Sequence, residues 1–180
     1  MSSSSLSSPF PSSVQEYSLT DNALHLDPAL DYIQLSVQNV VHCSHFTLQF
    51  WIKLNLDPAA EASLFSQLSG CMKITVLNDA GSEVLRWYKK EGDPEYSQAQ
   101  IDYQWRYWSF VNDPENQGQE NKIYVDAGIQ SSQSILYGAT FCGGTQVYLG
   151  YDQDGDYYMS KLGMWNVPLN ENQIFETMNK

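Results

Sequence analysis

The chain has 180 residues, of which 9 are Lys or Arg and 21 are Asp or Glu, so its formal net charge is −12. This length suffices for one domain with a substantial core. The negative charge repels phosphate backbones and anionic headgroups, which makes nucleic acid and membrane surfaces poor candidate partners. Charged residues make up 17% of the chain and aromatic residues 13%, a balance more typical of sheet proteins than of helical bundles.

The first segment, "MSSSSLSSPFPSS", is rich in Ser and Pro and cannot bury enough apolar surface to fold. We therefore predict a disordered arm over residues 1–16 and one domain over residues 17–180. The segment has neither the basic start nor the apolar run of a secretion signal, and no stretch approaches the ~20 apolar residues that span a bilayer. As written, the sequence predicts a cytosolic protein without membrane insertion, whereas an excerpt from a longer secreted protein would be extracellular.

The three cysteines are odd in number and have no C-x-x-C spacing, so they indicate neither a paired disulfide framework nor a zinc site. They are Cys43, Cys71 and Cys142. We expect three reduced cysteines, with one disulfide plus one free thiol as the alternative.

Apolar and polar residues alternate along most of the chain. The segment "FTLQFWIKL", residues 46–54, alternates in this way, which predicts a half-buried strand. One face carries the apolar residues Phe46, Leu48, Phe50, Ile52 and Leu54, and the other face carries the residues between them. Turn signals such as "NDAGS", "NDPENQG" and "DAG" separate the candidate strands. The spacing predicts a two-sheet antiparallel jelly-roll sandwich. Its strands are expected at 23–26, 31–37, 46–54, 63–68, 72–77, 83–89, 105–111, 121–126, 134–138, 145–150 and 160–165.

One helix is expected, at the end of the chain. Asn170 is placed to cap it, Gln173 to complete a capping box, and Leu169 with Ile174 to form a hydrophobic staple. The pattern predicts a helix over residues 171–178.

The loop "YDQDGD" carries Asp152, Asp154 and Asp156 at every second position. Like charges this close repel one another unless water, a cation or a cationic partner screens them. The EF-hand pattern does not fit, because Gly155 precedes the third Asp and no Glu follows at the required distance. The loop is therefore either a solvated hairpin turn or a hard-metal site.

Several aromatic residues lie at positions that alternate with the expected core. Exposed rings at such positions stack on the apolar faces of sugars or anchor a protein partner, and the alternative is that they pack in the core or under a loop. The candidate ligand-binding rings are Trp51, Trp87, Tyr124, Tyr148 and Tyr151. Trp165 is expected in the core beside the helix. Trp105 and Trp108 lie on opposite faces of one strand and cannot both belong to one ligand surface.

The amino-acid sequence of several segments resembles that of the concanavalin A-like jelly-roll superfamily, in its laminin-G and pentraxin branch, over residues 20–178. The resemblance is most specific in "VYLGYDQDGDYYMSKLGMWNVPLNENQI" and extends to "FTLQFWIKL", "SLFSQL", "WRYWSFV" and "KIYVDAG". It implies a non-catalytic, lectin-like module that binds glycans, lipid headgroups or proteins, often through calcium. The matching calcium positions are Asp152, Gln153 and Asp154, to which the spacing adds Asp156.

The chain departs from the pentraxin pattern in two places. Ser69, Gly70 and Cys71 stand where those relatives have an acidic residue and an amide, and the two strands that the family joins by a disulfide contain no cysteine. Both departures weaken the resemblance of the site more than that of the fold.

Catalysis is not expected. Glu91 and Glu95 in "EGDPE" match the glucanase pattern on paper, but the intervening Gly and Pro break the strand that such an active site needs. His42 and His45 flank Cys43 without a fourth metal ligand in sequence, and we expect exposed loop residues there. No nucleophile elbow or phosphate loop is present.

Two hypotheses follow. The first is a lectin-like binding module that recognises a glycan or protein, with calcium as its possible cofactor, at the loop edge near residues 152–156. The second is a structural or protein-interaction subunit of a larger assembly, without metal or sugar binding. The first is slightly favoured.

Overall fold

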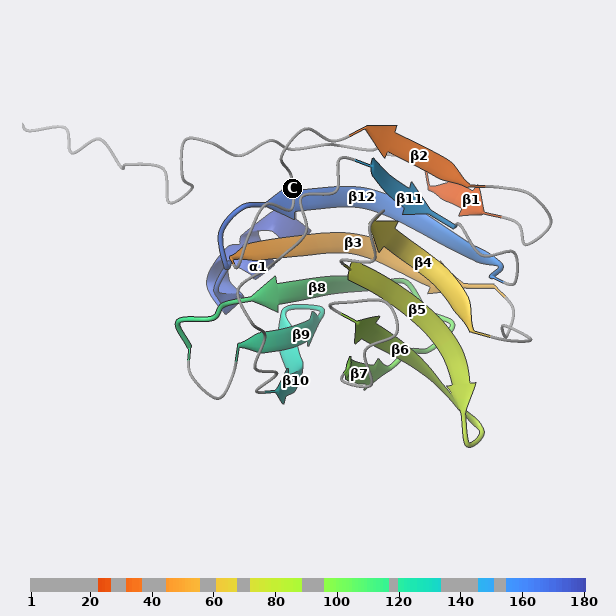
Figure 1. Ribbon diagram of the computed structural model, residues 1–180, viewed down its shortest axis with the longest axis horizontal. Helices are drawn as coiled ribbons and strands as arrows, with labels where there is room; N and C mark the ends of the chain where they lie inside the picture. Colours follow the sequence, from red (N-terminus) through yellow and green to blue (C-terminus); the bar gives the residue numbers. More distant parts are fainter. Residues whose placement is uncertain are drawn as a thin grey trace, which may run out of the picture.

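The alternating segments form strands that stack as two antiparallel sheets (Figure 1). The computed structural model describes residues 23–26, 32–36, 45–55, 61–67, 72–88, 96–116, 120–133, 146–150 and 155–180. Within these residues each sheet has six strands, in the orders β1-β12-β3-β8-β9-β10 and β2-β11-β4-β5-β6-β7. The predicted jelly-roll sandwich is therefore confirmed.

The first sheet contains β1 (Leu24–Leu26), β12 (Tyr157–Trp165), β3 (Phe46–Leu54), β8 (Arg106–Asn112), β9 (Asn121–Val125) and β10 (Gly128–Gln133). The second contains β2 (Ile33–Ser36), β11 (Gln146–Leu149), β4 (Ala62–Gln67), β5 (Met72–Asp79), β6 (Ser82–Tyr88) and β7 (Tyr96–Gln100). Helix α1 spans Glu171–Met178. No helix among the described residues is long and apolar enough to cross a membrane.

The core lies between the two sheets. The apolar face of β3 is directed into it and is essentially inaccessible to solvent, as are the counterparts on the second sheet. This face consists of Phe46, Leu48, Phe50, Ile52 and Leu54. Aromatic rings from the two sheets pack edge to face in this core. The ring centroid of Trp87 in β6 lies 5.9 Å from that of Phe46 in β3 and 5.7 Å from that of Phe110 in β8.

The outer face of β3 is more buried than the alternation predicts. Thr47 and Gln49 are fully covered because the chain after β12 returns across them. The Thr47 hydroxyl donates to the carbonyl of Val167 and accepts from the amide of Leu169, and Thr177 of α1 donates to the Gln49 side chain. These polar residues therefore dock α1 on the first sheet, and only the second half of β3 presents its outer face to solvent.

Strands β7 and β10 were not predicted, because "YSQAQ" and "GIQSSQ" are too polar to show an apolar period. Each is the last strand of its sheet, where one backbone edge is unpaired in the described part of the chain. The predicted arm over 1–16, the strand over 134–138 and the three cysteines lie outside the described residues.

Candidate functional site

Strand register gathers a set of side chains on the outer face of the first sheet that no sequence motif links. His25 of β1 pairs with Tyr158 of β12, and Tyr158 pairs with Lys53 of β3. Trp105 comes just before Arg106, which pairs with Ile52, the residue next to Lys53. Cross-strand partners point to the same face of a sheet, so these side chains cross three strands side by side.

The rings within this set are in contact. His25 stacks on Tyr158 with centroids 4.5 Å apart and planes 17° apart, and Trp105 approaches Tyr158 at 6.3 Å with planes 53° apart. Trp105 remains 39% exposed. We call His25, Tyr158, Lys53 and Trp105 the aromatic row. It combines an exposed indole with a phenol hydroxyl and an ammonium group, and no partner of Lys53 occurs among the described residues.

The acidic loop ends beside the aromatic row. Asp156 accepts hydrogen bonds from His25 Nε2 at its Oδ1 atom and from the Asn55 amide at its Oδ2 atom, both at 2.8 Å. The backbone amide of Asn55 also donates to the Asp156 carbonyl at 2.9 Å. Asp156 therefore ties the loop end to β1 and to the end of β3.

Each carboxylate oxygen of Asp156 accepts one hydrogen bond from the protein, so Asp156 is a structural anchor of the loop end, and its role as a calcium ligand stays a prediction. The other predicted metal positions, Asp152, Gln153 and Asp154, lie outside the described residues. No group of three His, Cys, Asp or Glu side chains arranged to hold a metal occurs within the described ranges.

The structure separates the predicted ligand-binding rings. Trp51 lies on the same outer face as the aromatic row, half-buried, with its ring 5.3 Å from that of Tyr107. Tyr148 lies on β11 of the second sheet, 5.8 Å from the exposed ring of Tyr32. Tyr151 lies outside the described residues.

Trp87 and Tyr124 are buried, which corrects their prediction as ligand-binding rings. Trp87 is 1% exposed because its phase of β6 faces the core, so no ligand reaches its ring. Tyr124 belongs to the buried cluster that packs under Leu169 and Ile174 of the C-terminal segment. Burial first, and the nearby carboxylates second, raise the pKa of Tyr124. For both residues the alternative of core packing holds.

Sequence patterns did not identify His25 and Tyr158 as site residues, and they assigned Trp105 no ligand role. Tyr158 follows the acidic loop on the polar phase of a strand, which is a signal that alternation could have revealed. His25 gives no such signal, because only the pairing of β1 with β12 brings it there. Of the rejected sites, His42, Glu91 and Glu95 lie outside the described residues. Trp165 packs beside α1 as predicted, and Trp108 is buried while Trp105 is exposed.

Comparisons with solved structures show the same fold in larger proteins. The receptor binding domain of botulinum neurotoxin mosaic serotype C/D has a TM-score of 0.72 at 15% identity, with 92% of this chain and 44% of that chain covered. The receptor binding domain of botulinum neurotoxin D has a TM-score of 0.69 at 15% identity, with 94% and 46% covered. The binding domain of botulinum neurotoxin DC has a TM-score of 0.71 at 12% identity, with 92% and 44% covered. The chain thus spans less than half the length of these domains.

A search of curated protein sequences found no match. A laminin-G family model, described as the concanavalin A-like lectin/glucanases superfamily, matches residues 27–175. This range covers most of the domain and includes every described strand except β1. The chain therefore belongs to the concanavalin A-like lectin/glucanase superfamily.

Proposed function

We propose that the chain is a non-catalytic binding module that holds a glycan on the aromatic row. The observation that carries this proposal is the exposed indole of Trp105 beside the ring of Tyr158, with Lys53 paired to Tyr158 on the neighbouring strand. A sugar has an apolar C–H face that packs on an aromatic ring and hydroxyls that need hydrogen-bond partners. The aromatic row offers both: His25, Tyr158 and Lys53 lie on paired strands, and Trp105 lies at the end of the connection that leads into β8.

One of the similar solved structures, the botulinum neurotoxin DC binding domain, is a complex with SialylT, and another, of serotype D, is a complex with N-acetylneuraminic acid. Those ligands belong to those proteins, of which this chain covers less than half. The proposal for this chain rests on its own aromatic row.

Calcium remains a separate proposal for the acidic loop. Asp152, Gln153 and Asp154 would supply hard oxygen ligands, while Asp156 would hold the loop end in place through His25 and Asn55. In that arrangement the metal would lie next to the aromatic row and bridge the loop to ligand hydroxyls.

A glycan array with the wild-type protein and Trp105→Ala tests the main proposal. We expect wild-type binding to a subset of glycans and a loss of about tenfold in affinity for the variant, because truncating an exposed Trp anchor removes about 1.4 kcal/mol or more. Tyr32→Ala is the matched control, since Tyr32 is an exposed ring just before β2 of the second sheet. Equal binding by wild-type and Trp105→Ala would contradict the proposal. Capture of a protein partner with no glycan binding would instead favour an interaction subunit.

A further inference from the structure

Trp105, the exposed indole of the aromatic row, lies in the connection between β7 and β8 rather than in a strand. The side chains of Tyr103, Gln104 and Trp105 are all exposed, and none of them belongs to a buried cluster. Apolar packing therefore does little to fix this part of the connection. The position of the indole against Tyr158 needs another physical cause.

An ion pair closes the connection at its base. The Nη2 atom of Arg106 donates to Asp102 Oδ2 at 2.7 Å, and its Nε atom lies 3.3 Å from Oδ1 and 3.2 Å from Oδ2 of the same carboxylate. The Oδ1 atom of Asp102 also accepts from the backbone amide of Gln104 at 3.1 Å. Asp102 and Arg106 therefore bracket Trp105 in sequence and hold the backbone on both sides of it.

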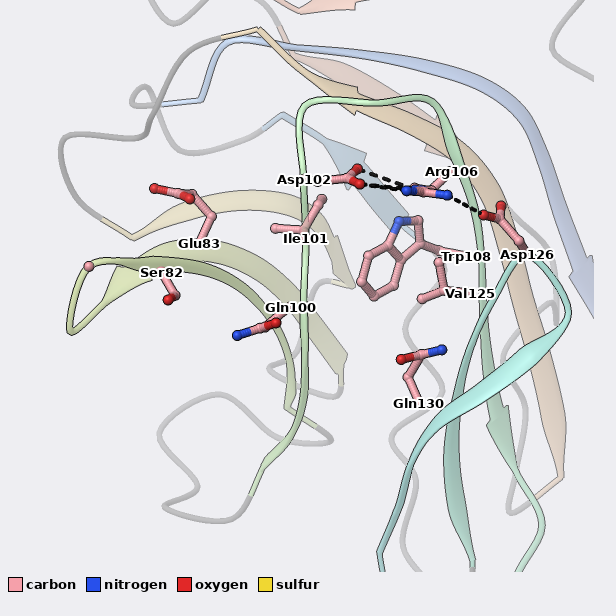
Figure 2. A pocket seen from close by; sticks show the side chains of 11 residues that line it. Ser82, Glu83, Gln100, Ile101, Asp102, Arg106, Trp108, Val125, Asp126 and Gln130 are labelled. Carbon is pink, nitrogen blue, oxygen red and sulfur yellow. Dashed lines mark hydrogen bonds and ion pairs between the residues drawn. The ribbon is translucent and has the colours of Figure 1, made fainter.

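A second carboxylate ties this ion pair to the first sheet. Asp126, in the turn between β9 and β10, accepts from Arg106 Nη1 at 3.0 Å. Its Oδ1 atom accepts from the backbone amide of Tyr107 at 2.9 Å, and its own amide donates to the Tyr107 carbonyl at 2.8 Å. Figure 2 shows Arg106 between the two carboxylates. We call Asp102, Arg106 and Asp126 the Arg106 clamp, which fastens the connection to a hairpin as well as to β8.

The Arg106 clamp is ionised at neutral pH. Hydrogen bonds from Arg106 are the main cause that lowers the pKa of Asp102, and hydrogen bonds to Asp102 first and Asp126 second raise the pKa of Arg106. A guanidinium offers its donors in one fixed plane, whereas the ammonium of a lysine is a point charge on a flexible stem. The clamp therefore depends on the shape of the Arg106 side chain as well as on its charge.

The Arg106 clamp lies on the other side of the chain from the aromatic row. Successive side chains of an extended chain point to opposite sides. Arg106 pairs with Ile52, which belongs to the core between the sheets, and it lines a pocket at one end of the sandwich (Figure 2). Trp105, one residue earlier, turns its ring to Tyr158 on the outer face. An effect of Arg106 on a ligand of the aromatic row therefore acts through the indole.

We propose that Asp102 and Arg106 are positioning residues, which hold the Trp105 indole against Tyr158 before a ligand binds. The inference rests on the proposed function, because it assigns these residues a role at the same site. Without the clamp, the connection has to be ordered when a ligand binds, and immobilising one large side chain weakens affinity by about three- to tenfold. With the clamp, this ordering is complete in the folded protein.

Relaxation of the Trp105 N–H groups, measured by NMR, tests the positioning without any ligand. We expect a backbone order parameter of about 0.85 in the wild-type protein and below about 0.6 in Arg106→Met, which keeps the apolar stem but removes the donors. The indole N–H, assigned by its loss in Trp105→Phe, should lose order with it, while that of Trp51 should not. Arg86→Met is the matched control, because Arg86 makes an equally short ion pair, 2.7 Å to Asp79, on the second sheet. Unchanged order of Trp105 in Arg106→Met would overturn the proposal.

The glycan array extends the test to binding. On the glycans that the wild-type protein binds, Arg106→Met should lose about threefold in affinity. Arg106→Lys should lose a similar amount, because it keeps the charge but lacks the planar fork that bonds both carboxylates, and Arg86→Met should bind like the wild-type protein. Wild-type affinity of Arg106→Lys would assign Arg106 an effect of charge alone and overturn its positioning role. If the wild-type protein binds no glycan but Trp105 loses order in Arg106→Met, the proposed function fails and the positioning of the indole stands.

Discussion

At the scale of single residues, Gly163 leaves no room for a side chain. A Cβ atom there would clash with the Trp165 ring, which belongs to the buried cluster under the C-terminal segment. Just before it, the pairing of β12 with β3 is irregular between Ser160 and Gly163, and Lys161 has a φ of 51°. The bulge and the glycine together let Trp165 lie back across its own strand.

Gly163→Ala should therefore force Trp165 out of its place. We expect a loss of about 1–3 kcal/mol in the free energy of unfolding, the usual cost of overpacking, and a fall in Tm of several degrees. Thermal denaturation followed by Trp fluorescence measures both. Gly128→Ala is the control, because a Cβ atom there would meet only ordinary contacts from 3.4 Å outward. Equal Tm values for the two variants would contradict this account.

Single residues also show what the sequence could not predict about the site. The polar phase of β3 marked Trp51 and Lys53 as outward, and the structure agrees. The same reasoning left Tyr124 open between an exposed ring and a packed one, and the C-terminal segment covers it. Alternation identifies two faces of a strand. It does not tell which outer face another segment will cover, because that depends on contacts far apart in the sequence.

At the scale of elements, α1 is the part that local rules determine most fully. The Asn170 side chain accepts from the Gln173 amide at 3.1 Å, and the Gln173 side chain accepts from the Asn170 amide at 2.9 Å, as the capping box predicts. The helix bounds agree with the prediction because cap and staple are encoded within a few residues. Strand β3 is equally well predicted, since its apolar period is long and unbroken.

Asn170→Ala should remove the cap and cost about 1 kcal/mol of stability. We expect Tm to fall by roughly 2–4 °C for a chain of this size. Asn166→Ala is the matched control, because Asn166 is exposed and precedes the helix without capping it. If Asn170→Ala melts with the wild-type protein, the capping box does not stabilise the domain.

Strands β7 and β10 illustrate the limit of local rules. Both are short and polar, and both become strands because they extend the ladders of β6 and β9 at the open edges of the sheets. Their positions also bring Gln100 and Gln130 to the pocket, so the part of the chain that sequence patterns describe least contributes directly to it.

At the scale of the whole molecule, the order of the strands makes the candidate site. The first sheet places β1 and β12, which are more than 130 residues apart in sequence at His25 and Tyr158, next to each other. The fold class could be predicted from the spacing of strands and turns together with the family resemblance. The aromatic row could not, because it depends on register between strands distant in sequence.

Calcium binding by the acidic loop would act on the stability of the whole domain. A cation that binds only the folded state adds about 2.7 kcal/mol when its concentration is 100 times its Kd, which corresponds to a rise in Tm of roughly 5–10 °C. We expect such a rise in millimolar calcium, its absence with magnesium or chelator, and its loss in Asp154→Ala. Thermal unfolding of the wild-type protein and the variant under these three conditions measures it.

Asp156→Asn separates a metal ligand from a structural anchor in the same experiment. Because Asp156 accepts from His25 and Asn55, the variant should melt below the wild-type protein even in chelator, and calcium should still raise its Tm. A variant that matches the wild-type Tm in chelator but no longer responds to calcium would instead make Asp156 a metal ligand. In that case the carboxylate would bind the ion with the lone pairs that His25 and Asn55 leave unused. No response of the wild-type protein to calcium would make the loop a solvated turn that serves only to hold β12 beside β1.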